Sequence, residues 1–147
     1  MLFIKQFIFA FIAVLGFAGY FNDKHKPTLL ATALSGGLAF LILYIFSLYG
    51  HDILGTFIAS LFIGIFGETL SIRLKTPSTI FITPAIIPLV PGAGMYYTML
   101  HFVNEEFSQM ISSGAQTIFI AGSIAMGILV ASIFSRSLKR MRRRNLK

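Results

Sequence analysis

The sequence predicts an all-α integral membrane protein with five transmembrane helices, the fourth of which is broken by proline and glycine. Mean hydropathy is +0.82. Of the 147 residues, 56% are hydrophobic and only 12% are charged, whereas a soluble domain carries about 25% charged residues. Long apolar runs alternate with short polar ones along the whole chain. This pattern excludes an ordinary soluble domain.

The apolar runs are long enough to cross a bilayer, which takes about 20 residues for a helix. They predict a single transmembrane domain at residues 1–135, with spans at about 2–21, 28–49, 53–72, 76–100 and 114–134, and a basic cytoplasmic tail at 136–147. The net charge of +7 arises mainly in this tail. We therefore expect it to meet the lipid surface and not a nucleic acid.

Small residues recur at steps of three and four in three of the spans, where they allow close helix packing. We expect packing faces and not solute contacts. The second span carries Thr28, Ala31, Thr32, Ser35, Gly36 and Ala39; the third carries Thr56, Ser60, Gly64, Gly67 and Ser71; and the last carries Gly114, Thr117, Ala121, Ala125, Ser132 and Ser135.

The fourth apolar run, residues 76–100, cannot form one continuous helix. It has no charged residue, but Pro84, Pro88 and Pro91 each lack an amide donor and clash with the preceding turn. A broken backbone is tolerated in a membrane only where protein or water surrounds it. Such breaks mark transport sites in many carriers. The alternative is a kinked helix that only packs against its neighbours.

The break predicts a place for an anionic group. Amides at the start of a half-helix carry the positive end of its dipole, and glycine lets a ligand approach the backbone closely. The candidate substrate-binding residues are the amides of Gly92, Ala93 and Gly94, the polar side chains of Thr79, Thr83 and Tyr96, and the prolines that set the break, Pro88 and Pro91.

Glu68 is the acidic residue inside a predicted span. An intramembrane carboxylate is a functional candidate by default, here for proton coupling. The alternative is a structural glutamate that snorkels to the interface or pairs with Arg73. Arg73 and Lys75 follow at the end of the span and would raise the local anion concentration at a cytoplasmic mouth.

Basic residues concentrate on the cytoplasmic side of membrane proteins. Five spans with the amino terminus outside place eleven of the twelve basic residues in the cytoplasm and only Lys5 outside. If residues 76–100 dipped in and returned, the basic tail would lie outside instead. We therefore expect this segment to cross, and the carboxyl terminus to be cytoplasmic.

The residue pattern does not support an enzyme, a metal site or a cofactor. There is no cysteine, and His25, His51 and His101 lie far apart in separate predicted loops. No nucleophile elbow or phosphate loop is present in the sequence.

Several motifs together resemble the threonine/serine exporter (ThrE-like) family, in particular its short YjjB-like members. They are Thr-Pro-Ser-Thr-Ile-Phe at 76–81, Ala-Ile-Ile-Pro-Leu-Val-Pro-Gly at 85–92, Tyr96 to Met99, and Gly-Phe-Ala-Gly-Tyr-Phe-Asn at 16–22. The Ile-Ile-Pro-Leu-Val-Pro-Gly run is the most specific of them.

The resemblance implies the carboxy-terminal half of a secondary-active exporter in the bacterial plasma (inner) membrane. Its substrates would be small carboxylate-bearing solutes, namely threonine/serine-type amino acids or dicarboxylates such as succinate. A larger YjjP-like membrane subunit would supply the amino-terminal half. Two alternatives stay open: a non-transporting membrane scaffold or regulatory subunit, and a channel formed by a homo-oligomer.

Overall fold

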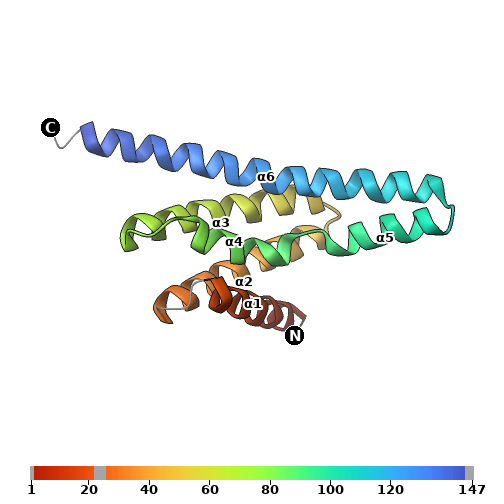
Figure 1. Ribbon diagram of the computed structural model, residues 1–147, viewed down its shortest axis with the longest axis horizontal. Helices are drawn as coiled ribbons and strands as arrows, with labels where there is room; N and C mark the ends of the chain where they lie inside the picture. The colour runs from red at the N-terminus through yellow and green to blue at the C-terminus, as the bar shows by residue number, and fades with distance from the viewer. Residues whose placement is uncertain (1, 22–25, 145–147) are drawn as a thin grey trace.

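The computed structural model describes residues 2–21 and 26–144. Within these ranges the chain is helical and contains no strand, so the predicted all-α class is confirmed (Figure 1). The predicted polar residues 22–25 and Lys147 lie outside the described residues. The elements are α1 (Leu2–Phe21), α2 (Lys26–Leu48), α3 (Asp52–Leu74), α4 (Thr79–Ile86), the 3-10 turn η1 (Ile87–Leu89), α5 (Gly92–Val103) and α6 (Phe107–Arg144).

Four of these helices, α1, α2, α3 and α6, are long and apolar enough to cross a membrane. The segment Thr79–Leu89 together with Gly92–Val103 meets the same criteria as a pair bent by 49°. The described residues thus hold four candidate crossings, or five if the bent pair counts as one. The prediction of a membrane-spanning helical protein with a broken fourth segment is confirmed.

A tight turn joins α2 to α3 and brings them side by side. Gly50 adopts a φ of 74°, a left-handed conformation that glycine takes without a Cβ penalty. The amides of Gly50 and His51 then donate to the carbonyls of Ser47 and Phe46, at 3.0 Å each. These bonds satisfy carbonyls that the end of α2 would otherwise leave open.

The packing centres on α3, which lies against α2 on one side and α6 on the other. Helix α1 packs on α2, and α4 fits against α1, α2 and α3. The shared core contains Ala39, Ala59, Ile63, Ile82, Ala85, Leu89 and Ile124. Three of these seven residues are alanines, which let the helix backbones approach closely, as is usual where lipid offers no hydrophobic drive between helices.

The predicted small faces of the second and third spans are confirmed, because Thr32, Ser35, Thr56, Ser60 and Gly64 are all buried. Their hydroxyls are satisfied within their own helices: Thr32 donates to the Thr28 carbonyl at 2.9 Å, and Ser60 to the Phe57 carbonyl at 2.9 Å. A hydroxyl bonded in this way behaves as a small side chain at a helix contact.

The predicted small face of the last span is partly wrong. Ala121 and Ala125 are exposed, and the buried face runs instead through Ser123, Gly127 and Ala131. This face meets α3 so closely that Ser60 Oγ lies 3.4 Å from the Ser123 carbonyl. This buried stripe continues at a period of four residues to Ser135, which belongs to the predicted face, and Thr117 of the predicted face is buried as well.

The chain break lies at one end of the helical bundle and not in its middle. Pro91 on the break and Ile120 on α6 line one pocket with Ser47 and Asp52, which flank the α2–α3 turn. Beyond the α2–α3 turn, α5 and the first turns of α6 form an antiparallel hairpin that extends past α1, α2 and α3 (Figure 1). At the other end, α6 continues through the basic run to Arg144.

The contact of Gly127 with α3 predicts that alanine substitutions at two glycines of α6 will differ in their effect on stability. A Cβ on Gly127 would lie 2.8 Å from the Phe57 carbonyl oxygen and 3.0 Å from the Leu61 nitrogen, whereas one on Gly122 meets nothing within 4 Å. Gly127→Ala should cost about 1–3 kcal/mol, because backbone atoms cannot move aside easily. Gly122→Ala should be neutral. Thermal unfolding in detergent measures both; equal melting temperatures would contradict this packing.

Candidate functional site

The backbone between α4 and α5 is forced out of helical geometry. Pro88 lies in the 3-10 turn, and Val90 is extended with φ −61° and ψ 129°. A residue that precedes proline avoids the helical region, because the proline ring clashes with it. Pro91 follows at φ −77° and ψ 60°, and α5 begins at the next residue.

Two amides at the start of α5 are left without a hydrogen-bond acceptor. Gly92 N donates to the Val90 carbonyl at 2.8 Å, and Met95 N donates to the Pro91 carbonyl at 3.1 Å. Between them, the amides of Ala93 and Gly94 have no acceptor within residues 26–144, and no side chain caps the helix. Unpaired amides here carry the positive end of the helix dipole and attract anions.

These two residues line a pocket of about 350 Å³ between α5 and α6. The α5 wall also presents Tyr97 and His101, at successive turns of the helix. The α6 wall presents Ser113, Gln116, Thr117 and Ile120. Apart from the His101 imidazole, the polar groups of the pocket are neutral. They are the hydroxyls of Tyr97, Ser113 and Thr117, the side-chain amide of Gln116, and backbone donors. The pocket suits a small polar solute with a negative end.

Gly94 and Thr117 hold the two walls together. A Cβ on Gly94 would collide with the Thr117 hydroxyl oxygen, so only glycine allows the helices to approach this closely. Thr117 Oγ1 donates to the Ser113 carbonyl at 2.7 Å, and Thr98 Oγ1 donates to the Gly94 carbonyl at 2.7 Å. Both hydroxyls keep free lone pairs but have used their protons.

His101 lies at the far end of the pocket and contacts the loop that joins α5 to α6. Its Nδ1 is 2.6 Å from Glu106 Oε2. Our sequence interpretation placed His101 in a surface loop, but it belongs to α5 and faces the pocket.

A second pocket of about 220 Å³ lies on the bundle side of the break. It is lined by Tyr44, Ser47, Asp52 and Thr56 of α2 and α3, together with Pro88 to Pro91. Two residues, Pro91 and Ile120, border both pockets.

The structure brings some of the predicted site residues together and leaves others apart. Pro91, Ala93 and Gly94 line the α5–α6 pocket, and Pro88 lines the second pocket. Gly92 is exposed beside them. Three further candidates are exposed and line neither pocket: Thr79 and Thr83 on α4, and Tyr96, whose ring packs edge-on against Tyr97.

Sequence reasoning missed Tyr97, Ser113 and Gln116. One signal could have found them: Tyr97 and His101 are four residues apart, and Ser113, Gln116 and Thr117 are three and four apart. Each set therefore lies on one face of its helix.

Glu68 lies near the opposite end of the bundle. It is only 7% exposed, and Ser78 Oγ, just before α4, donates to its Oε1 at 3.2 Å. Arg73 and Lys75 are exposed beyond it, and Lys75 ends α3 in a left-handed conformation with φ 54°. Across residues 2–21 and 26–144, no cluster of acidic and histidine side chains could hold a metal ion.

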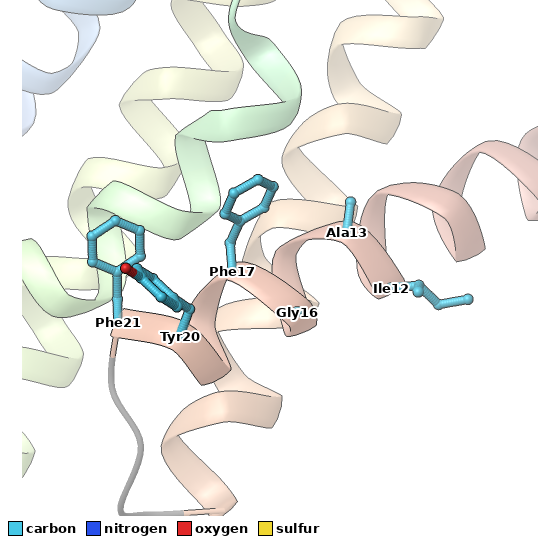
Figure 2. A pocket seen from close by; sticks show the side chains of 6 residues that line it. All are labelled: Ile12, Ala13, Gly16, Phe17, Tyr20 and Phe21. Atoms are coloured by element: carbon cyan, nitrogen blue, oxygen red, sulfur yellow. The ribbon is translucent and has the colours of Figure 1, made fainter.

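A third hollow, of about 500 Å³, follows the outer face of α1. Figure 2 shows that its six lining residues all come from this one helix, from Ile12 to Phe21. The lining is apolar except for the Tyr20 hydroxyl. Such a groove on an exposed membrane helix suits lipid chains and not a polar solute.

Helices long and apolar enough to cross a membrane, together with one broken segment, are features found in membrane transport proteins. The family of the chain is shown by comparison with known sequences: residues 6–134 match the family described as "Threonine/Serine exporter, ThrE". The chain belongs to this threonine/serine exporter family.

The chain is similar to three curated relatives, two of which are named as threonine/serine exporters. The chain is 33% identical over 137 residues to an uncharacterized protein of Haemophilus influenzae, covering 86% of this chain and 45% of the relative. It is 28% identical over 114 residues to the threonine/serine exporter of Corynebacterium glutamicum, covering 78% and 23%. It is also 28% identical over 109 residues to the probable threonine/serine exporter of Mycobacterium tuberculosis, covering 69% and 21%.

The chain thus spans less than half the length of each of these relatives. No solved structure matches it significantly.

The α5–α6 pocket predicts a difference in reactivity between two isosteric variants of α6. The chain has no cysteine, so each engineered thiol reports alone. Ser113→Cys, on the pocket wall, should react with a small methanethiosulfonate reagent at least about tenfold faster than Ser123→Cys, which is buried against α3. Similar rates would contradict an open pocket.

Proposed function

We propose that this chain is a subunit of a secondary-active exporter of small carboxylate-bearing solutes, in which the α5–α6 pocket binds the carboxylate. The observation that carries the proposal is the pair of unpaired amides, Ala93 and Gly94, in the wall of a polar pocket. Uncharged donors on a helix dipole hold an anion without a full countercharge. Moderate binding of this kind lets the solute leave again.

The rest of the pocket fits a hydroxylated amino acid. Its volume of about 350 Å³ admits a small solute together with water. Gln116 and the lone pairs of Ser113 and Thr117 offer partners for a hydroxyl or ammonium group. Threonine and serine, named for two of the relatives, combine these groups. A dicarboxylate such as succinate would instead place its second carboxylate near His101.

The distribution of charge supports an orientation of the chain in the membrane. Arg73, Lys75 and the basic run at the end of α6 lie at one end of the bundle, and the hairpin carrying Glu105 and Glu106 lies at the other (Figure 1). By the positive-inside rule the basic end is cytoplasmic. The solute would enter at the cytoplasmic end and reach the α5–α6 pocket on the outer side of the bacterial plasma membrane.

We propose Glu68 as the proton-coupling group of this cycle. It is buried near the cytoplasmic end and bonded to Ser78, which directly precedes α4. Protonation of Glu68 would change the strength of that contact and hence the hold of α3 on the start of the broken segment. We also propose that a larger YjjP-like membrane subunit takes part in this cycle.

Alanine substitutions at Gly94 and Gly92 distinguish the contribution of the pocket to export from that of the chain break. Gly94→Ala puts a methyl group onto Thr117, whereas Gly92→Ala adds one that faces open space. Export of labelled threonine or succinate from cells that also carry the partner should fall at least about tenfold for Gly94→Ala, because the pocket is distorted. It should change less than about twofold for Gly92→Ala. Equal export by both variants, at matched membrane levels, would rule out the pocket as the binding site.

The coupling role of Glu68 predicts a specific change in pH dependence. Glu68→Gln keeps an acceptor for Ser78 but cannot ionise. Transport by this variant should lose its response to an imposed pH gradient, while Asp52→Asn, in the same helix, should keep it. The measurement is initial export rate against external pH in energised vesicles. An unchanged pH response in Glu68→Gln would refute the role.

A further inference from the structure

The turn between α5 and α6 brings residue 106 back beside His101. Helix α5 ends in two hydrogen bonds: the Glu106 amide donates to the His101 carbonyl at 2.9 Å, and the Glu105 amide donates to the Phe102 carbonyl at 3.1 Å. Together with the left-handed conformation of Glu105, at φ 61°, these bonds form a Schellman turn. The backbone therefore fixes the position of Glu106 relative to the pocket wall.

The side chains of this turn are unusual for its geometry. In a Schellman turn, the residue after the left-handed position commonly makes an apolar contact with the helix that the turn closes. Here both partners are ionisable, because His101 Nδ1 lies 2.6 Å from Glu106 Oε2. Glu105 also occupies a left-handed position, which glycine takes without a Cβ penalty. The turn geometry itself requires none of these three side chains.

The contact with Glu106 determines which nitrogen of His101 carries a proton. An ionised carboxylate can only accept hydrogen bonds, so Nδ1–H is the donor to Glu106. In a neutral imidazole, Nε2 then keeps its lone pair and accepts a hydrogen bond; in a protonated imidazole, Nε2 donates and the ring is positively charged. Because His101 lines the α5–α6 pocket, Nε2 is the nitrogen left for a solute.

The charge at this end of the pocket depends on His101. The sequence has no lysine or arginine between residues 92 and 119. The other titratable side chains around His101 are Tyr97, one turn earlier on α5, and Glu105 and Glu106 in the turn. The wall formed by α6, the helix on which α5 packs, carries only neutral side chains: Ser113, Gln116, Thr117 and Ile120. A proton on His101 therefore offsets the negative charge of Glu106.

We propose that His101 is the specificity-determining residue of the α5–α6 pocket and that Glu106 is its positioning residue. With His101 neutral, the pocket selects a solute whose second polar group is an ammonium or a hydroxyl, because Nε2 accepts a hydrogen bond and Glu106 attracts a cation. With His101 protonated, the pocket selects a solute that ends in a second carboxylate. The inference rests on the proposed function in that this pocket binds the solute.

The proposal makes the choice of solute depend on pH. Histidine is the side chain that ordinarily changes its charge between about pH 8 and pH 5. Acidification on the side of the membrane that holds the turn therefore shifts the pocket from amino acids toward dicarboxylates. The His101 side chain is 20% exposed and that of Glu106 is 44% exposed. Solvent and salt screen part of their charge, so we expect changes of a few-fold.

Charged thiol reagents measure this charge without any solute. Gly114 lies against Thr98, so Ser113 lies opposite the part of α5 between Tyr97 and His101. Ser113→Cys is treated, in membranes opened to both faces, with the anionic sulfonatoethyl or the cationic trimethylammonioethyl methanethiosulfonate. Because the same thiolate attacks both reagents, the ratio of the two rates reports the local charge and not the reactivity of the thiol.

The anionic-to-cationic rate ratio should rise at least about threefold between about pH 8 and pH 5.5, because a proton on His101 attracts the sulfonate and repels the ammonium. His101→Asn keeps an N–H for Glu106 but cannot ionise, so its ratio should change less than about 1.5-fold. The matched control is His51→Asn in the exposed α2–α3 turn, which should respond like the parent. Glu106→Gln should raise the ratio at least about twofold at both pH values, because it removes a negative charge.

A ratio that ignores pH in the parent, or that rises equally in His101→Asn, would overturn the role of His101. An unchanged ratio in Glu106→Gln would overturn the role of Glu106. The uncharged reagent methyl methanethiosulfonate checks that the pocket is intact, because its rate should be the same in every variant. If His101→Asn fails this check, His101→Gln takes its place.

Export distinguishes this inference from the proposed function. In cells that also carry the partner, the ratio of succinate to threonine export should rise at least about threefold when the medium is acidified from about pH 8 to pH 5.5. His101→Asn should abolish this rise, and His51→Asn should keep it. A rise that persists in His101→Asn would refute the specificity role alone. No export of either solute, with a reagent ratio that still depends on His101, would refute the exporter function alone.

Discussion

Everything in this structure depends on a backbone that cannot be helical between Pro88 and Pro91. The two prolines remove two amide donors and hold Val90 extended, so α4 must end and a new helix must begin at Gly92. The new helix starts without a cap, which leaves the amides of Ala93 and Gly94 unpaired. A single steric constraint thus creates the proposed anion site and also turns the chain through 49° away from the bundle.

The close contact of α3 with α6 makes use of that turn. Gly64, Ser60 and Gly127 let the two helices approach closely enough for backbone contact, and this fixes the position of α6 along the bundle. α6 then continues past the α2–α3 turn and offers Thr117 to Gly94 on α5. The pocket therefore depends on two glycine contacts. Gly127 positions α6 against α3, and Gly94 positions α5 against Thr117, which lies nearer the start of α6.

The helical class, the membrane spans and the break could be predicted from the sequence, because hydropathy and proline act locally. The packing faces of α2 and α3 could be predicted for a similar reason, since their small residues form a single stripe. On α6 small residues occur on more than one face, and only the contact with α3 shows that Ser123 and Gly127 are buried while Ala121 and Ala125 are not. The α6 wall of the pocket also depends on tertiary packing, so Ser113 and Gln116 were missed.

The central claim is that the break lies at the edge of the bundle and that the hairpin continues beyond it. The most direct test is the membrane depth of single spin labels at Tyr49, Val90 and Phe102, measured by electron paramagnetic resonance with lipid-soluble and water-soluble relaxing agents. Tyr49 and Val90 should lie at the same depth, and Phe102 should lie farther from the bilayer midplane on that side. Val90 at the bilayer midplane, with Phe102 level with Tyr49, would contradict the account.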